Sequence, residues 1–307
     1  MTLQQLRYVA SIVEAGSFNE AARNLYVAQP TLSGAIKELE RELGIHIFNR
    51  TSRGATLTDE GAEFLSYARQ VLEQADLLER HYLGTPPQPQ LCAISTQHYA
   101  FAVEAFVALI RETGADRYKF TLRETRTHDI IEDVASLRSE AGILFENDFN
   151  RSVLRQCMDE HHLEFHPLFE AEPHVFLSHE HPLADRDSIR LPDLDPYPRL
   201  AYEQGDDNSF FFSEEILSTV EHARSIYVSD RATLFNLLIG LNGYTLCTGV
   251  LNSDLNGDDI VAVPLVSDER MLLGYVTNRR ASLSAMAQRY LAKLREILSA
   301  DGFELLS

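Results

Sequence analysis

A proline-rich segment constrains this chain more than any other feature, because residues 84–90 (Gly-Thr-Pro-Pro-Gln-Pro-Gln) place three prolines in seven positions. Proline has no backbone N–H to donate, so neither a helix nor a sheet continues through such a segment, and we expect a stiff hinge. The hinge separates an N-terminal part from residues 91–307, which are numerous enough to form their own core.

The segment just before the hinge predicts one long helix over residues 59–83, with Thr58 as its N-cap. Apolar residues recur along it at alternating steps of four and three, which is a heptad seam. A helix packed on its own domain is the alternative, but the seam is longer than a small domain needs. We therefore expect a homodimer whose interface contains Phe64, Ala68, Val71, Ala75, Leu78 and Tyr82.

Charge is distributed unevenly along the chain. The formal net charge is −19, yet the first 58 residues contain six basic and five acidic residues, whereas the remainder contains 21 basic and 41 acidic ones. A protein that is acidic throughout is a poor partner for nucleic acid. In this chain only the N-terminal segment lacks a large negative charge, so only that segment is suited to bind nucleic acid.

Residues 1–58 predict three short helices and a hairpin. Capping-box spacings at Thr2 and Ser17 start the first two helices, and a third opens near Gln29 with a proline in its first turn. Gly44 ends the third helix, and residues 45–58 form the hairpin with its turn at 52–54. The buried row of the third helix is Leu32, Ile36, Leu39 and Leu43.

The opposite face of the third helix is small and partly basic, which suits a helix lying in a DNA major groove. Gln29 is placed to read an adenine edge, and Lys37 and Arg41 to reach phosphates, while Glu38 opposes phosphate contact. The predicted DNA contacts are Gln29, Pro30, Thr31, Ser33, Gly34, Lys37 and Arg41 on the helix, and Arg50 and Arg53 on the hairpin wing.

These residues carry a family resemblance. Ser17-Phe18, Ala21-Ala22, Gln29-Pro30-Thr31-Leu32-Ser33, Leu43-Gly44 and Phe48 stand at the spacing of the N-terminal signature of LysR-type transcriptional regulators. The resemblance implies a multidomain α+β protein with a winged helix-turn-helix (1–58), a dimerising linker helix (59–83), a hinge (84–90) and an effector-binding domain (91–307). Ala28 departs from it, because the family commonly has a capping serine there.

The resemblance further implies a two-lobed α/β effector domain like those of periplasmic binding proteins, with a small inducer between the lobes. Tetramers built as dimers of dimers, bent promoter DNA and contact with RNA polymerase are also implied. From the alternation of strand-like and helical segments we expect parallel sheets, with a helix around 211–220. Lobe 1 is expected to span about 91–161 and 266–307, and lobe 2 about 162–265.

Ligands of such lobes lie at strand ends beside helix N-termini, where hydroxyl and amide groups suit a carboxylate or another small anion. Each of these polar residues has an alternative role as a helix cap. The candidate effector contacts are Ser95, Thr96, Gln97, Thr125, Thr127, His128, Glu146, Tyr202, Gln204 and Thr248.

Other function classes lack their characteristic residues. Cys92, Cys157 and Cys247 form no Cys-x-x-Cys pair and indicate buried thiols in a reducing compartment. Histidines between 161 and 181 lack metal-ligand spacing, so we expect no metal and no cofactor. No nucleophile elbow, phosphate loop or dinucleotide fingerprint is present, which argues against an enzyme.

The first residues do not resemble a signal peptide, and no apolar run is long enough to span a membrane, so a cytoplasmic location without membrane contact is expected. The remaining alternative is a small-molecule binding protein without a DNA function. It would respond to ligand but ignore DNA, whereas a regulator binds DNA with strong salt dependence.

Overall fold

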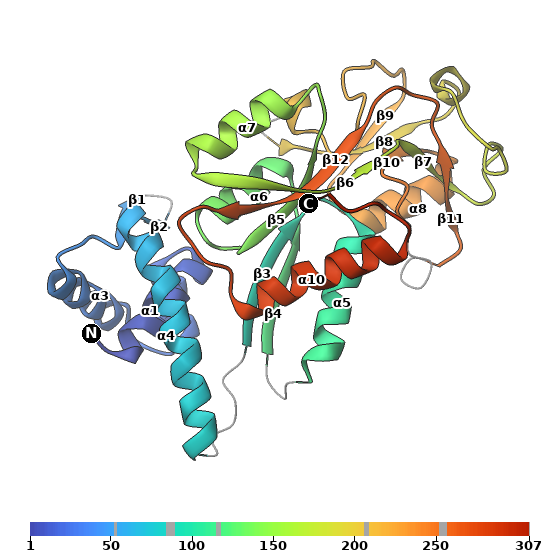
Figure 1. The fold of residues 1–307 in the computed structure, drawn as a ribbon. Coiled ribbons are helices and arrows are strands. Elements are labelled where there is room, and N and C mark those ends of the chain that lie inside the picture. Colours follow the sequence, from blue (N-terminus) through green and yellow to red (C-terminus); the bar gives the residue numbers. More distant parts are fainter. Residues whose placement is uncertain (52–53, 84–89, 115–117, 206–208, 252–256, 307) are drawn as a thin grey trace.

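The computed structural model describes residues 1–51, 54–83, 90–114, 118–205, 209–251 and 257–306. Its N-terminal domain contains three helices and a two-stranded antiparallel hairpin, as the sequence predicts (Figure 1). These elements are α1 (Leu3–Ala15), α2 (Phe18–Asn24), α3 (Gln29–Leu43), β1 (Phe48–Thr51) and β2 (Gly54–Leu57).

Side-chain caps start the first two helices. Thr2 and Gln5 form a capping box, and the Ser17 hydroxyl accepts a hydrogen bond from the backbone N–H of Glu20. Ala28 gives α3 no side-chain cap, because its methyl group cannot accept a hydrogen bond. The Glu40 carboxylate instead secures the other end of α3, because it accepts hydrogen bonds from the N–H groups at 47 and 48.

The core of this domain continues into the long helix α4 (Asp59–Leu83), which the Thr58 hydroxyl caps by accepting from the N–H of Gly61 at 2.9 Å. Val9, Leu39 and Leu65 are fully buried in a common cluster. Helix α4 lies so close to the wing that a Cβ on Gly61 would stand 2.1 Å from the Ile47 carbonyl oxygen. Glycine is therefore required at that crossing.

The predicted seam of α4 divides into two parts. Ala68 is buried within its own chain, so for this residue the alternative of packing within the chain holds. Val71 and Leu78 are 43% and 62% exposed, and Phe64 and Ala75 are half-buried. The side chain of Tyr82 lies outside the described part of the chain. Tyr67, which lies off the predicted seam, is 61% exposed.

The larger sheet of the C-terminal domain has the strand order β4-β3-β5-β12-β6 and is covered by helices on both faces (Figure 1). Helices α5 and α10 pack on one face, and α6 and α7 on the other. The strands are β3 (Gln90–Thr96), β4 (Tyr118–Glu124), β5 (Ala141–Glu146), β6 (Leu163–Ala171) and β12 (Met271–Asn278). The helices are α5 (Ala100–Thr113), α6 (Thr127–Ala135), α7 (Arg151–Glu160) and α10 (Ala285–Ala300).

A second, smaller lobe contains an antiparallel sheet with the order β10-β7-β11 and a parallel pair β8-β9. Helix α8 packs against this pair and β7, and the described part of the lobe also contains the 3₁₀ turns η1 and η3. The elements are β7 (His174–Ser178), η1 (Leu191–Leu194), β8 (Arg199–Tyr202), η3 (Phe210–Phe212), β9 (Ser225–Val228), α8 (Arg231–Leu241), β10 (Thr245–Cys247) and β11 (Ile260–Pro264).

Three expectations are corrected by this topology. Strand β6 belongs to the larger sheet, so the lobe boundary expected at 162 falls after Ala171. The sheets are not purely parallel, because β12 runs antiparallel to both β5 and β6. The helix expected around 211–220 is the 3₁₀ turn η3 followed by turns, since Leu217 has a left-handed φ of 55° that no helix accepts.

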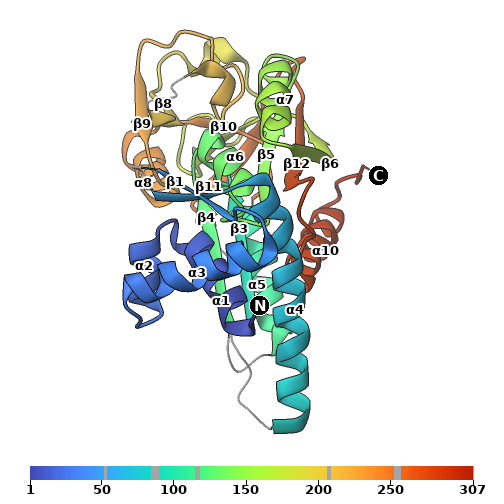
Figure 2. The same cartoon turned by 90° about the vertical axis from the view of Figure 1, so that its left-hand side faces the viewer.

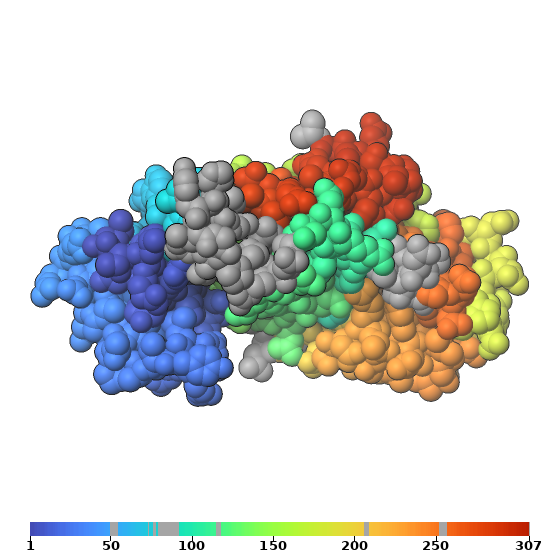
Figure 3. Space-filling model, turned by 90° about the horizontal axis from the view of Figure 1, so that it is seen from below, coloured from blue at the N-terminus to red at the C-terminus, as the bar shows by residue number. Residues whose placement is uncertain are grey.

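The N-terminal domain rests on the larger lobe of its own chain (Figures 2 and 3). Leu137, in the turn after α6, is 2% exposed and packs in the core cluster of the N-terminal domain. Arg69 donates to the Leu137 carbonyl at 3.2 Å, and the Ser66 hydroxyl accepts from the N–H of Ser282 at 3.0 Å. An ion pair joins Asp59 to Arg280. These contacts couple the position of α3 to the lobe.

Within the described ranges, no helix combines the length and the apolar character needed to cross a bilayer.

We predict opposite effects for two glycine-to-alanine substitutions. Gly61→Ala should lower the free energy of unfolding by about 1–3 kcal/mol, because the new methyl group meets a backbone oxygen. Gly34→Ala should raise it by up to about 1 kcal/mol, because no atom lies within 4 Å of the new Cβ in a helix. Thermal unfolding of both variants checks this, and equal stabilities would contradict the close crossing of α4 and the wing.

Candidate DNA-binding surface and inter-lobe cavity

Helix α3 presents an open outer face. Leu32, Ile36 and Leu39 of its apolar row are buried against α1 and α2. Leu43, the last residue of the predicted row, is 37% exposed, so the prediction of a buried side chain is wrong there. The opposite side chains are exposed, and no neighbouring atom stands over Gly34. In Figure 1 the helix lies at the outer end of the molecule, away from both lobes. The exposed predicted residues are Pro30, Thr31, Gly34, Lys37 and Arg41, while Gln29 and Ser33 are half-buried.

The electrostatics of this face are mixed, as the sequence indicates. A guanidinium nitrogen of Arg41 lies 4.0 Å from a Glu38 carboxylate oxygen, with side chains 81% and 64% exposed. Such an exposed pair has little strength and leaves the arginine able to exchange its partner for a phosphate.

The wing is described only in part. Arg50 lies on β1 opposite Ala55, but its side chain is outside the described residues, as is the whole of Arg53.

Tyr26 is a surface residue that the sequence analysis missed. It stands in the turn between α2 and α3, is 95% exposed and has a left-handed φ of 55°. A bulky residue rarely adopts this conformation, and such strain concentrates at functional positions. The sequence feature that could have indicated Tyr26 is a large aromatic residue that belongs to the apolar row of neither α2 nor α3.

A cavity lies between the two lobes and encloses about 530 Å³, including the part open to solvent. Its walls come from both lobes and mix aromatic, aliphatic and ionisable side chains. Of the predicted effector contacts, Tyr202 and Thr248 line it. The complete lining is His98, Tyr99, Ala100, Phe176, Tyr202, Glu214, Glu215, Arg231, Leu234, Phe235, Thr245, Leu246, Cys247, Thr248 and Val250.

One buried contact joins the lobes at this cavity. A Glu214 carboxylate oxygen accepts from the backbone N–H of His98 at 3.0 Å and lies 2.8 Å from its Nδ1. Both side chains are at most 5% exposed. The imidazole also stacks on the Tyr202 ring, with centroids 3.8 Å apart and planes 6° from parallel. His98 follows β3 in one lobe, whereas Glu214 and Tyr202 belong to the other.

A chain of amides and hydroxyls runs beside this contact. Gln97 donates to the Thr127 hydroxyl at 2.6 Å and accepts from the Tyr99 hydroxyl at 2.8 Å. Gln204 accepts from the Thr127 backbone N–H at 3.3 Å and donates to Glu214 at 3.4 Å. Thus Gln97, Thr127 and Gln204 connect the lobes rather than line the cavity.

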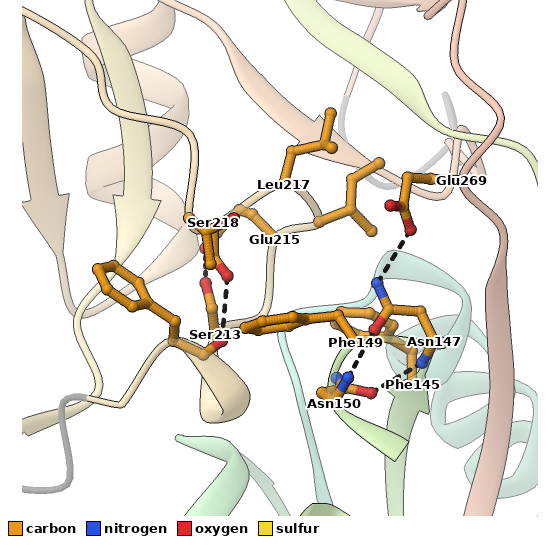
Figure 4. A pocket seen from close by; sticks show the side chains of 12 residues that line it. Phe145, Asn147, Phe149, Asn150, Ser213, Glu215, Leu217, Ser218 and Glu269 are labelled. Carbon is orange, nitrogen blue, oxygen red and sulfur yellow. Dashed lines mark hydrogen bonds between the residues drawn. The ribbon is translucent and has the colours of Figure 1, made fainter. Parts of the chain in front are cut away.

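Glu215 is buried between this cavity and a neighbouring one of about 390 Å³ (Figure 4). Its carboxylate accepts from the Tyr202 N–H at 2.9 Å and from the Ser213 hydroxyl at 3.0 Å. Burial, and then the charge of Glu214, raise the pKa of Glu215 to about 7. The second cavity is lined by Phe145, Asn147, Phe149, Asn150, Phe210, Ser213, Glu215, Ile216, Leu217, Ser218, Thr219 and Glu269.

Two predicted effector residues are committed elsewhere, which corrects their assignment to the cleft. The Ser95 hydroxyl donates to Asp133 at 2.7 Å and contacts Ser139. Glu146 is fully buried and held by two arginines, with Arg155 Nη2 at 2.6 Å. A strand-end position does not by itself decide which way a side chain points.

The other predicted residues line neither cavity. The Thr96 hydroxyl donates to the Gln97 carbonyl and the Thr125 hydroxyl to Asp129, while the His128 ring packs edge-on against Phe212. Sequence reasoning missed His98, Glu214, Glu215 and Arg231. The sequence feature that could have indicated Glu214 and Glu215 is their position as an adjacent acidic pair shortly after three consecutive phenylalanines.

We predict that Glu215→Gln changes stability in a pH-dependent way. A folded-state pKa of about 7 exceeds the unfolded value of about 4.3, so ionising Glu215 destabilises the fold as pH rises through 7. The melting temperature of the variant should therefore rise relative to wild type between pH 5 and pH 8. Exposed Glu221→Gln is the control, and a pH-independent difference for Glu215→Gln would contradict the burial of this carboxyl group.

Comparisons with known proteins agree with both halves of this architecture. Residues 3–62 match the model of the bacterial regulatory helix-turn-helix protein, lysR family, and residues 116–299 match the LysR substrate binding domain. The uncharacterized HTH-type transcriptional regulator YbhD of Escherichia coli is 26% identical, with 97% of this chain and 92% of that protein covered. The DNA-binding transcriptional dual regulator OxyR of Escherichia coli is also 26% identical, over 90% and 89%.

Among solved structures, a full-length OxyR variant from Pseudomonas aeruginosa shares the fold, with a TM-score of 0.58. It is 20% identical, with 96% of this chain and 95% of that chain covered. The open face of α3, the wing and the two-lobed domain with its cavity are thus the parts of a known type of regulator. The chain belongs to the LysR family of bacterial helix-turn-helix transcriptional regulators.

Proposed function

We propose that this chain is a dimeric regulator that places two α3 helices in successive major grooves of promoter DNA under the control of a small effector between its lobes. The observation that carries the proposal is the uncrowded outer face of α3, which presents Gly34, Lys37 and Arg41 at the end of the molecule. In this proposal the chain acts by binding DNA and effector and not by catalysis.

Individual DNA contacts follow from chemistry and position. Gln29, at the start of α3, reads an adenine edge with its amide, and Thr31 lies against a thymine methyl group. Lys37 and Arg41 contact phosphates, and Arg50 and Arg53 on the wing reach the backbone or the adjacent minor groove. The acidic C-terminal domain repels DNA and so confines binding to this surface.

Helix α6 is the element that transmits the effector signal in this proposal. At its start, Thr127 joins the inter-lobe chain of hydrogen bonds, and just beyond its end Leu137 packs into the N-terminal domain. An effector that changes the separation of the lobes shifts α6, and with it the angle of α3. The free energy by which the effector shifts the equilibrium equals the difference between its binding free energies for the two states.

The dimer forms along the exposed part of α4, where Val71 and Leu78 leave apolar area uncovered. We further propose a dimer of dimers, with RNA polymerase as a partner at the promoter. Family membership also supports the cytoplasm as the location, because a promoter-binding regulator acts where the DNA is.

A peroxide response like that named for some relatives is the second candidate. Several related proteins are hydrogen peroxide-inducible genes activators. In this chain, burial raises the pKa of the Cys92 and Cys247 thiols, whereas peroxide-reactive cysteines have a lowered pKa. These two thiols therefore do not suit a peroxide response. Cys157, on α7, is half-buried and does not line the inter-lobe cavity, so we favour a non-covalent effector.

Two substitutions on α3 should separate affinity from specificity. Lys37→Ala should weaken binding to all sequences and reduce the slope of log affinity against log salt by about 1, because one phosphate contact is lost. Gln29→Ala should lose about 1–3 kcal/mol of discrimination at a single base pair. Fluorescence anisotropy with an operator and its point variants, at several salt concentrations, measures both.

The matched control is Arg111→Ala at the end of α5, an exposed cation outside the N-terminal domain that should leave DNA binding unchanged. If Gln29→Ala weakened all sequences equally, the assignment of base reading to Gln29 would be wrong. If neither α3 variant changed binding, α3 would not be the recognition helix.

A further inference from the structure

We propose that the effector of the inter-lobe cavity is a small organic cation, an amine on an apolar body, rather than an anion. This inference rests on the proposed regulatory role of that cavity and names the chemical class of its ligand. It departs from the anion that helix N-termini at the strand ends suggest, because the hydroxyls at those positions already have protein partners or line neither cavity.

The cavity walls carry more negative than positive charge. Glu214 and Glu215 line it, and Glu269 lines the adjoining cavity. Among the described residues of both linings, Arg231 is the only arginine or lysine, and it is already paired with the carboxylate of Glu124. Above pH 7, where Glu215 is ionised, an anion would meet two buried carboxylates, whose repulsion is strong where water is excluded. A cation would be attracted by the same groups.

A second, independent feature marks the cavity as a binding site. Thr245, on β10, is 4% exposed and lines the cavity, yet its hydroxyl makes no hydrogen bond to any residue that the structure describes. Thr245 therefore leaves a hydroxyl group available to a ligand in the cavity. The Thr245 hydroxyl, like the neighbouring carboxylates, is able to accept a hydrogen bond from an ammonium group.

The rest of the lining indicates what kind of carbon skeleton the ammonium group is attached to. Phe176, Leu234, Phe235 and Val250 form an apolar wall, and Tyr202 presents an aromatic ring. Cation–π attraction to an aromatic face strengthens the binding of an ammonium group, and burial strengthens the binding of an apolar body. The lining therefore fits an aliphatic or aromatic amine better than an inorganic cation.

Three series of compounds with matched carbon skeletons test the ligand class. Primary amines, carboxylates and alcohols with butyl, hexyl and phenylethyl bodies are added to the full-length protein, and thermal unfolding and calorimetry are recorded. We expect the amines to raise the melting temperature and bind, with the alcohols weaker and the carboxylates without effect. Binding of the carboxylates in preference to the amines, or of none of the three series, would overturn the proposal.

A pair of variants localises the effect. At pH 8, above the pKa of about 7 of Glu215, Glu215→Gln should weaken amine binding at least tenfold, because an ionised hydrogen-bond partner is lost. Glu221→Gln removes an exposed carboxylate from the same lobe outside both cavities and should leave amine binding unchanged. Equal affinities of the two variants would overturn the proposal. Circular dichroism confirms that both are folded.

DNA binding by the ligand-free wild-type protein is a separate measurement. Amine binding without DNA binding would overturn the proposed regulator but leave the ligand class standing. DNA binding together with a preference for carboxylates would overturn only the ligand class.

Discussion

The burial of Leu137 in the core of the N-terminal domain is the contact on which the arrangement of the whole molecule depends. The residue belongs to the larger lobe, yet its side chain completes a cluster formed by the helices that carry the DNA-binding surface. Its carbonyl accepts from Arg69 of α4, so the same residue is held by both packing and hydrogen bonding. Close-packed contacts of this kind transmit displacement instead of absorbing it.

The same turn follows a helix that begins at the inter-lobe contact. Helix α6 begins at Thr127 and ends at Ala135, a rise of about 12 Å, and Leu137 lies two residues beyond its end. The helix and the turn after it therefore contact both the hydrogen-bond chain beside the inter-lobe cavity and the N-terminal domain. The acidic lining of the cavity and the open face of α3 lie at opposite ends of one physical connection.

Local patterns predict the N-terminal domain well, because its helices are specified by caps and apolar rows within a few residues of each other. Thr2, Ser17, Thr58 and Gly44 act as the sequence indicates. The cavity was less predictable, because its residues meet only through the fold. His98 and Glu214 are 116 positions apart, and nothing near either one in the sequence indicates the other. The position of β6 is likewise decided by its pairing with β12 across the domain.

The most direct test of the central claim is selection of DNA by the purified full-length protein from a random-sequence pool, with retention measured between about 50 and 200 mM salt. We expect enrichment of a sequence with two half-sites about one helical turn or a multiple apart, and a steep loss of affinity with salt. A folded protein that enriches no sequence and shows no salt dependence would contradict it. That result would indicate a ligand-binding protein whose α3 helix does not bind DNA.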